Sequence, residues 1–241
     1  MVETKVSKDK SEGDILAIKA RDQYKTVDEL MKKSESNSVY YTLLVLSSSI
    51  IAFGLLLNNS AVVIGGMLVT PVLTPVLFIS LGIVINEIDL VKRVGMLLVK
   101  SFLIIGGAGY LSSLVFGASE MPILFENSMR TAALYFMVAL GAGIAAGFAW
   151  TRKDVVDALP GVAIAVALVP PVTMVGIGLF LFNFELVRFY LFAFLFNIFG
   201  VIVGGLIVFS LLDFYKTKNK VHKEVEESVK EEEKAKAKKK K

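Results

Sequence analysis

Two clusters of proline and threonine interrupt long apolar stretches, and residues of these types can bind a small ligand. The clusters comprise Thr70, Pro71, Thr74, Pro75, Pro170, Pro171 and Thr173. Proline has no amide hydrogen, and its ring clashes with the carbonyl one turn earlier, so a proline within a helix frees a backbone acceptor. Freed carbonyls that face a cavity can coordinate a cation, whereas the start of a resumed helix presents amide hydrogens to an anion. The clusters are therefore the candidate binding site for a small solute or ion.

A purely structural explanation of the same residues stays open. An unpaired backbone group costs several kcal/mol in hydrocarbon, so a broken helix persists in a membrane only where protein or water satisfies it. The threonine hydroxyls beside the prolines can bond the freed carbonyls, which would make each cluster a repaired kink. Both explanations fit the sequence.

Lys100 and Asn197 complete the candidate site. Lys100 is the only full charge well inside a predicted span, and Asn197 lies near the middle of the last span. Ionisable residues at depth are functional candidates, although Lys100 is close enough to a border to extend its ammonium to the headgroups. Asparagine at depth bonds across helices, with a ligand contact as the alternative. Asn59, Ser60 and Asp157 precede apolar runs and are expected to cap helices.

The composition argues against an enzyme and against a resident cofactor. The chain has no cysteine, which excludes thiolate chemistry and cysteine-bound metal. Its one histidine, His222, lies in a charged tail, so a histidine metal site within the membrane is not expected. The sequence has no nucleophile elbow, P-loop or HExxH motif. No carboxylate is predicted at mid-depth, which argues against an embedded proton relay. We expect no metal, no cofactor and no catalysis.

The apolar stretches predict an all-α, polytopic membrane protein. Of the 241 residues, 55% are hydrophobic, and roughly 20 apolar helical residues cross a bilayer core of about 30 Å. Six spans are predicted at residues 40–57, 61–85, 94–116, 131–150, 159–182 and 187–212. The proline clusters interrupt the second and the fifth span. A charged segment (1–39) precedes this transmembrane domain (40–213), and a lysine-rich tail (214–241) follows it.

The distribution of positive charge predicts the orientation. The two ends of the chain and the second and fourth connections hold 23 of the 26 lysines and arginines. Six spans place these segments on one side, and positive residues mark the cytoplasmic side. We therefore expect a protein of the cell membrane with both termini in the cytoplasm.

A weak internal repeat joins the two proline clusters. At an offset of 99 residues "TPVLTPV" (70–76) lies over "VPPVTMV" (169–175), and after a three-residue gap "DLVK" (89–92) lies over "ELVR" (185–188). Because each half has three spans, the second half must cross the membrane in the opposite sense. The match predicts two inverted three-helix repeats, about 40–116 and 131–212, which is the pattern of secondary transporters. A duplication retained only for packing is the alternative.

The flanking segments and the glycines indicate the partners. Leu16, Ala20, Tyr24, Val27 and Met31 follow helical spacing among charges, which predicts an amphipathic helix on membrane lipid. The basic tail either associates with anionic lipid or stays solvated, and nothing supports nucleic-acid binding. Small-xxx-small spacings at 143–147 and 200–204 let helices approach closely, within a protomer or between protomers, and so favour a homo-oligomer.

The stretches "LLLNNSAVVIGGMLVTPVLTPVLFISLGI" and "ALPGVAIAVALVPPVTMVGIGL" resemble the domain-of-unknown-function 389 family, hydrophobic proteins of bacteria and archaea. The resemblance covers residues 38–212 and implies a membrane fold with a proline-rich second span, without a defined activity. Longer members carry a soluble amino-terminal domain. Here only a short charged segment stands in that place, so a regulatory role of such a domain is not expected.

The leading functional hypothesis is a secondary transporter or permease for a small solute, with its site where the two interrupted spans cross. A membrane scaffold or sensor that acts through its cytoplasmic termini is the alternative. A channel is third, because no span is polar along one full face.

Overall fold

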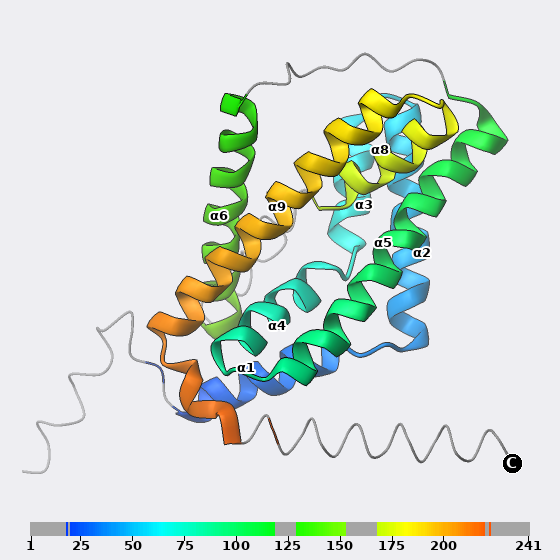
Figure 1. Cartoon of the computed structure of the whole chain (residues 1–241). Helices are drawn as coiled ribbons and strands as arrows, with labels where there is room; N and C mark the ends of the chain where they lie inside the picture. The colour runs from blue at the N-terminus through cyan, green and yellow to red at the C-terminus, as the bar shows by residue number, and fades with distance from the viewer. Residues whose placement is uncertain (1–17, 19, 119–128, 153–167, 220–221, 223–241) are drawn as a thin grey trace, which may run out of the picture.

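The computed structural model describes residues 18, 20–118, 129–152, 168–219 and 222, and these residues form a bundle of helices (Figure 1). In chain order the helices are α1 (Ala20–Lys33), α2 (Ser38–Leu56), α3 (Ser60–Val69), α4 (Leu73–Val84), α5 (Ile88–Phe116), α6 (Met129–Thr151), α8 (Val169–Phe180), α9 (Phe184–Leu211) and the 3-10 helix η2 (Phe214–Thr217). The expected all-α class is confirmed for this part of the chain.

Four of the described helices are long and apolar enough to cross a membrane: α2, α5, residues Ala133–Thr151 of α6, and α9. Helices α3 and α4 pass the same test together, as a pair bent by 53°, which is the geometry of a broken span or a re-entrant loop. The described residues thus hold up to five spans. The expected fifth span, 159–182, is described only from residue 168, where the 12-residue α8 follows, so the count of six stays a prediction.

The two ends of the bundle carry different elements. Helix α1, the turn between α4 and α5, and the carboxyl-terminal ends of α6 and α9 lie together, at the bottom of Figure 1. We call this the α1 end. The turn between α8 and α9 lies at the opposite end. Helices α5 and α9 therefore begin at opposite ends of the molecule.

Helix α5 begins earlier than its predicted span. It starts at Ile88 rather than at residue 94, with Glu87 at its N-cap, and the charged residues Asp89, Lys92 and Arg93 lie in its first two turns. Hydropathy marks where a helix becomes apolar, whereas backbone hydrogen bonding lets it extend further into polar surroundings. The helix is for this reason longer than the span.

One helix-ending turn occurs three times, after α2, α4 and α8. In each copy the amide of the residue after the turn donates to the carbonyl five residues earlier, which is the Schellman arrangement. These bonds join Asn59 N to Gly54 O (2.8 Å), Glu87 N to Gly82 O (2.9 Å) and Asn183 N to Gly178 O (3.0 Å). The left-handed turn residues are Asn58 (φ 51°), Asn86 (φ 55°) and Phe182 (φ 52°). The donor residue of each bond is also the N-cap of the next helix, so the chain reverses without a loop.

The next helix folds back closely onto the glycine that precedes each of these turns. A Cβ at Gly82 would lie 2.7 Å from Leu90 Cδ2, and a Cβ at Gly178 would lie 3.0 Å from Leu186 Cδ2. The two contacts are equivalent at a spacing of 96 residues. The same spacing relates the first residues of α4 and α8, and those of α5 and α9. The helix starts of the two halves are thus 96 residues apart. This offset is three residues shorter than the offset of 99 at which the proline motifs match.

The glycines of α6 and α9 pack against each other within the chain. A Cβ at Gly143 would lie 2.5 Å from the Val201 carbonyl oxygen, and a Cβ at Gly204 would lie 2.5 Å from that of Leu140. The close approach that their spacing predicts is therefore made inside one protomer. Homo-oligomerisation stays a prediction.

Candidate functional site

The break between α3 and α4 is repaired in part by a threonine. Thr70 ends α3 with an extended backbone (φ −73°, ψ 126°) and is followed by Pro71. Its hydroxyl donates to the Gly66 carbonyl at 3.0 Å, and its amide donates to the Met67 carbonyl at 3.3 Å. Two carbonyls of the last turn of α3 thus have partners, as the kink explanation requires.

Helix α4 resumes at Leu73 without a side-chain cap on its first turn. Thr74 is partly buried and Pro75 is buried. Because Pro71 and Pro75 have no amide hydrogen, only Val72, Leu73 and Thr74 in this stretch carry N–H groups. The start of α4 therefore offers fewer donors than an ordinary helix start, which leaves four N–H groups without intrahelical partners.

The second proline pair lies at a helix start in the described residues. Pro170 and Pro171 occupy the second and third positions of α8, which begins at Val169, and the N-cap Leu168 makes no side-chain cap bond. Proline is tolerated there because these amides have no partner within the helix. Residues 153–167, where the preceding part of the expected span would lie, are outside the described residues.

Thr173 is buried where α8 packs on α5. Its hydroxyl donates to the Val169 carbonyl at 3.1 Å, and the side chain has 0% exposure. A Cβ at Gly109 of α5 would overlap the Thr173 carbonyl oxygen. Among the candidate residues, Thr70, Pro71, Thr74 and Pro170 are partly buried, whereas Pro75, Pro171 and Thr173 are buried. Surface access is thus greater at the first cluster than at the second.

Helices α4 and α8 each pack on a long helix from the other half of the chain. On α9, Gly205 accommodates Ser80 of α4, since a Cβ at Gly205 would lie 2.7 Å from Ser80 Oγ. The Ser80 hydroxyl donates to the Ile202 carbonyl of α9 at 3.1 Å. On α5, Gly106 and Gly109 accommodate α8 in the same way.

The residues of these two crossings are counterparts at the spacing of 96. The pairs of counterparts are Ser80 and Gly176, Gly106 and Ile202, and Gly109 and Gly205. A Cβ at Gly176 would overlap the Gly106 carbonyl oxygen, whereas Ser80 reaches the Ile202 carbonyl with its hydroxyl. One crossing is thus closed by a hydrogen bond and the other by direct backbone contact.

Lys100 and Asn197 lie in different environments. Lys100 is exposed on α5, while its neighbour Ser101 is fully buried and hydrogen-bonded to the Tyr40 hydroxyl at 2.8 Å. Asn197 is 2% exposed on α9 and has a partner within the chain. The exposed position of Lys100 favours the headgroup explanation over a role beside Asn197.

The structure places the expected caps as follows. Asn59 is the N-cap of α3, and its side-chain oxygen accepts from Ala61 N (3.0 Å) and Val62 N (3.3 Å). Ser60 is the first residue of the helix, so the capping position belongs to Asn59 and not to Ser60. Asp157 lies outside the described residues. Asn37 and Asn183 cap α2 and α9, and their place before apolar runs could have identified them.

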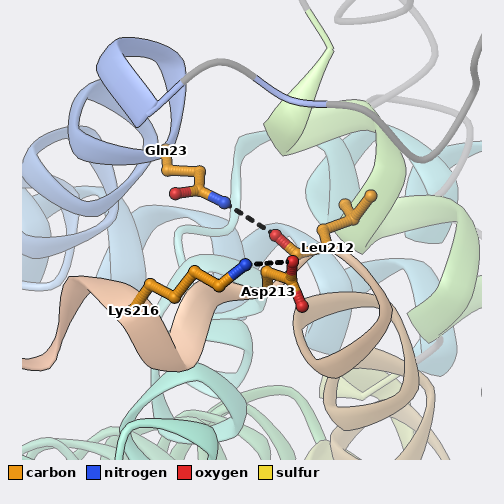
Figure 2. Close-up of polar contacts among 4 residues, drawn as sticks. All are labelled: Gln23, Leu212, Asp213 and Lys216. Atoms are coloured by element: carbon orange, nitrogen blue, oxygen red, sulfur yellow. Dashed lines mark hydrogen bonds and ion pairs between the residues drawn. The ribbon is translucent and has the colours of Figure 1, made fainter.

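The α1 end contains polar contacts that the sequence did not predict. Gln23 Nε2 donates to the Leu212 carbonyl at 2.7 Å (Figure 2), and the Thr26 hydroxyl donates to the Trp150 carbonyl at 3.3 Å. Val27 and Leu30 are fully buried, and the Lys33 ammonium lies 4.7 Å from the centre of the Trp150 ring. Helix α1 is therefore packed against the ends of α6 and α9 rather than only against lipid.

An ion pair follows α9 at the same end. The Lys216 ammonium lies 2.5 Å from Asp213 Oδ2, as Figure 2 shows. The hydrogen bond from Lys216 lowers the pKa of the Asp213 carboxyl, and the same bond raises the pKa of Lys216. Both side chains are exposed, so water screens the interaction.

The helices and the broken pair define a membrane protein. The chain belongs to the family described as Domain of unknown function (DUF389), whose family model matches residues 67–203. This match includes the break at Thr70, helices α4, α5, α6 and α8, and most of α9. No curated protein and no solved structure is detectably similar to the chain.

Proposed function

We propose that the protein is a secondary transporter or permease for a small solute or ion, built from two inverted halves. The observation that carries the proposal is the reciprocal crossing: α4 packs on α9, and α8 packs on α5, through residues related by one spacing of 96. Paired interrupted segments in corresponding positions of inverted halves are the best pointer to a transporter site.

The crossing suits a rocking movement. Each half contributes one short helix to the packing of the other, so a rotation of one half changes both crossings together. At the crossing of α8 on α5, Gly106 and Gly176 place backbone surfaces against each other without an interlocking side chain between them, which favours such a movement. The solute would sit beside the starts of α4 and α8.

The prolines at these starts shift the balance from amide donors, which bind anions, toward oxygen atoms, which bind cations. Four prolines remove amide donors where the two helices begin, while the hydroxyl oxygens of Thr70 and Thr74 keep lone pairs that can bind a cation. Oxygen atoms are the ligands that hard cations prefer. A small cation, alone or with a solute, is therefore the substrate class that we propose.

The α1 end is proposed to face the cytoplasm of the cell, because the positive residues lie in segments assigned to that side. A cysteine at Ser36, exposed at this end, should then react with a membrane-impermeant thiol reagent only from the inside of oriented vesicles. Leu57 lies in the turn between α2 and α3, at the other end of the bundle, and is 70% exposed. A cysteine there should react only from the outside.

Single cysteines at Thr74 and Thr173 test alternating access, and the chain has no cysteine of its own. We expect Thr74→Cys to react in the conformation described, and Thr173→Cys to react only when the second crossing opens. Labelling from both sides in sodium, potassium or choline media would then show side-dependent rates that the cation changes. The Ser36 and Leu57 variants control for orientation and leakage. Rates that are the same in all three media, with Thr173→Cys never labelled, would sink the proposal.

A membrane sensor or scaffold is the second candidate, and the contacts of α1 favour it. Gln23 and Thr26 join an amino-terminal helix to the ends of α9 and α6, so an event at α1 can reach the membrane helices. Deleting residues 1–36 would abolish a sensor function, and Thr74→Ala would leave it intact. If the protein is a transporter, Thr74→Ala should reduce its function more than deleting residues 1–36 does.

A further inference from the structure

A hollow of about 70 Å³ lies at the α1 end, between the last turn of α1 and helices α4 and α5. Its polar lining consists of Ser34, Glu35, Ser36 and Arg93, and Phe78 and Leu97 contribute to its apolar part. None of these residues belongs to the two proline clusters. The hollow is therefore separate from the proposed transport site.

Ser34 lines this hollow and has an unused hydrogen-bonding group. The residue is 7% exposed, and its hydroxyl oxygen is the one fully buried side-chain polar atom without a hydrogen-bond partner among the residues the structure describes. Buried polar groups in proteins are nearly always hydrogen-bonded, so an exception calls for an explanation. A rotation about χ1 that turns the Ser34 hydroxyl toward the hollow would let a ligand there supply the missing partner.

The charges around the hollow favour an anion. Arg93 is partly buried and lies on the wall formed by α5, whereas Glu35 is exposed, where water screens its charge. Arg93 also has an interaction within the chain, but a guanidinium has five N–H donors and can serve two partners. The Ser36 hydroxyl donates to the Tyr41 hydroxyl at 3.0 Å, which leaves Ser34 and Arg93 as the donors for a ligand.

The volume of the hollow and its position along α5 limit which anions can bind there. A buried water needs about 10–15 Å³ of such space, so the hollow holds roughly five heavy atoms, the number in a phosphate group. Arg93 lies immediately before the apolar part of α5, and Ile88 and Met96 on the same helix are exposed. The hollow is thus at the depth where lipid headgroups meet a span.

We propose that this hollow binds a phosphate group, with the Ser34 hydroxyl and the Arg93 guanidinium as donors to its oxygens. The phosphate can come from a phospholipid headgroup or from free phosphate. In either case the bound group joins the end of α1 to α5, and so fastens the amino-terminal helix to the membrane helices. The proposal does not depend on transport.

Thermal unfolding of the full chain in phosphate-free maltoside detergent tests this site. Three probes are compared at constant ionic strength: inorganic phosphate, dihexanoyl phosphatidylglycerol, and dihexanoylglycerol as the phosphate-free control. We expect a concentration-dependent rise in Tm with at least one phosphate compound and none with dihexanoylglycerol, because a ligand that binds only the folded state stabilises it. A response to phosphatidylglycerol alone identifies the lipid, and a response to inorganic phosphate identifies the free ion.

Variants separate this site from general binding to the surface. Ser34→Ala and Arg93→Gln should weaken the response at least tenfold, whereas Lys92→Gln, which changes the exposed neighbouring charge, should leave it within twofold. Glu35→Gln should keep or strengthen it. Ser34→Thr, which retains the hydroxyl, controls for damage to the fold.

Three results would overturn the proposal. No rise with either phosphate compound means that water alone fills the hollow. An unchanged response in Ser34→Ala and Arg93→Gln places binding elsewhere. A response that Glu35→Gln abolishes, with Arg93→Gln unaffected, makes the hollow a cation site.

Discussion

The Ser80 hydroxyl on α4 donates to the Ile202 carbonyl on α9 across 122 residues of sequence. At the counterpart positions, Gly176 of α8 lies directly against the Gly106 carbonyl of α5. The two crossings therefore use counterpart positions with different chemistry, which allows each to be perturbed by itself.

Gly176→Ala should disrupt the crossing of α8 on α5. The added Cβ would overlap a backbone oxygen that cannot move aside, and overpacking of this kind costs about 1–3 kcal/mol. Gly107→Ala on the same α5 helix is the matched control, because its Cβ would meet nothing within 4 Å. Thermal unfolding in detergent should show a clear loss for Gly176→Ala and no loss for Gly107→Ala. Equal effects would mean that the helices are not in this contact.

Ser80→Ala should weaken the other crossing without crowding it. Removing the hydroxyl leaves the Ile202 carbonyl without this donor, and a net loss of about 0.5–1.5 kcal/mol is expected. Ser49→Ala serves as the control, since Ser49 donates to Val45 of its own helix at 2.8 Å. Unfolding by denaturant should rank Ser80→Ala below Ser49→Ala in stability, and the reverse order would contradict the cross-helix bond.

Phe182 is a large residue in a left-handed turn, so its replacement should stabilise the protein. The backbone has φ 52° and the side chain is 80% exposed. The left-handed conformation costs an ordinary residue about 1–2 kcal/mol, and the other two copies of the turn use asparagine. Phe182→Asn should raise Tm, whereas Phe184→Asn on the neighbouring helix should not. A fall in Tm for Phe182→Asn would show that the ring is needed by lipid or by another protein.

The sequence predicted the fold where the signal is local. Charged borders identified the long helices, and Pro71 identified the break in the second span because proline removes a specific backbone hydrogen bond. The gapped match of DLVK with ELVR has the register of 96, but the proline motifs match at 99 because they are offset by three residues from the helix starts, and valine matches carry little information. The hollow beside Ser34 was not predictable, since an unpaired hydroxyl becomes visible only when its neighbours are known.

The burial of Thr173 and the exposure of Lys100 show the same limit. Both lie in apolar stretches, and the hydropathy of a stretch does not say which helical face meets protein. Contact with Gly109 decides the matter for Thr173, while Lys100 turns away from the buried side of α5 that Ser101 occupies.

The bonds from α1 should hold the amino-terminal helix to the bundle. Gln23→Ala and Thr26→Val each remove a donor to a carbonyl near the end of a membrane helix, and each should cost about 0.5–1.5 kcal/mol. Arg21→Gln, at an exposed position of the same helix, should be neutral. Hydrogen exchange of the α1 amides measures the effect directly. Exchange that is unchanged in Gln23→Ala and Thr26→Val would show that Val27 and Leu30 alone hold α1.

The Asp213 and Lys216 pair predicts a small dependence of stability on pH. The pKa of Asp213 is lowered in the folded state, so its contribution is present above the unfolded pKa of about 3.9 and is lost as pH falls through the lower folded value. The pKa of Lys216 is raised in the folded state, so its contribution to stability is present at lower pH and is lost at strongly alkaline pH. The Tm difference between the native chain and Asp213→Asn, measured from pH 2 to 9, should be constant near neutrality and shrink below about pH 3.9. A difference that persists at pH 2 would assign the effect to the turn and not to the charge.

The separation between Ser80 and Ile202 has a consequence for how the protein is made. At roughly 5–20 residues per second, the ribosome needs about 6–24 s after Ser80 before the partner carbonyl exists. During that interval the hydrogen bonds of α3 and α4 within the described residues are local ones, among them the bond from Thr70 to Gly66. The Thr70 hydroxyl thus satisfies a carbonyl at the end of α3 in the membrane before α9 has been synthesised.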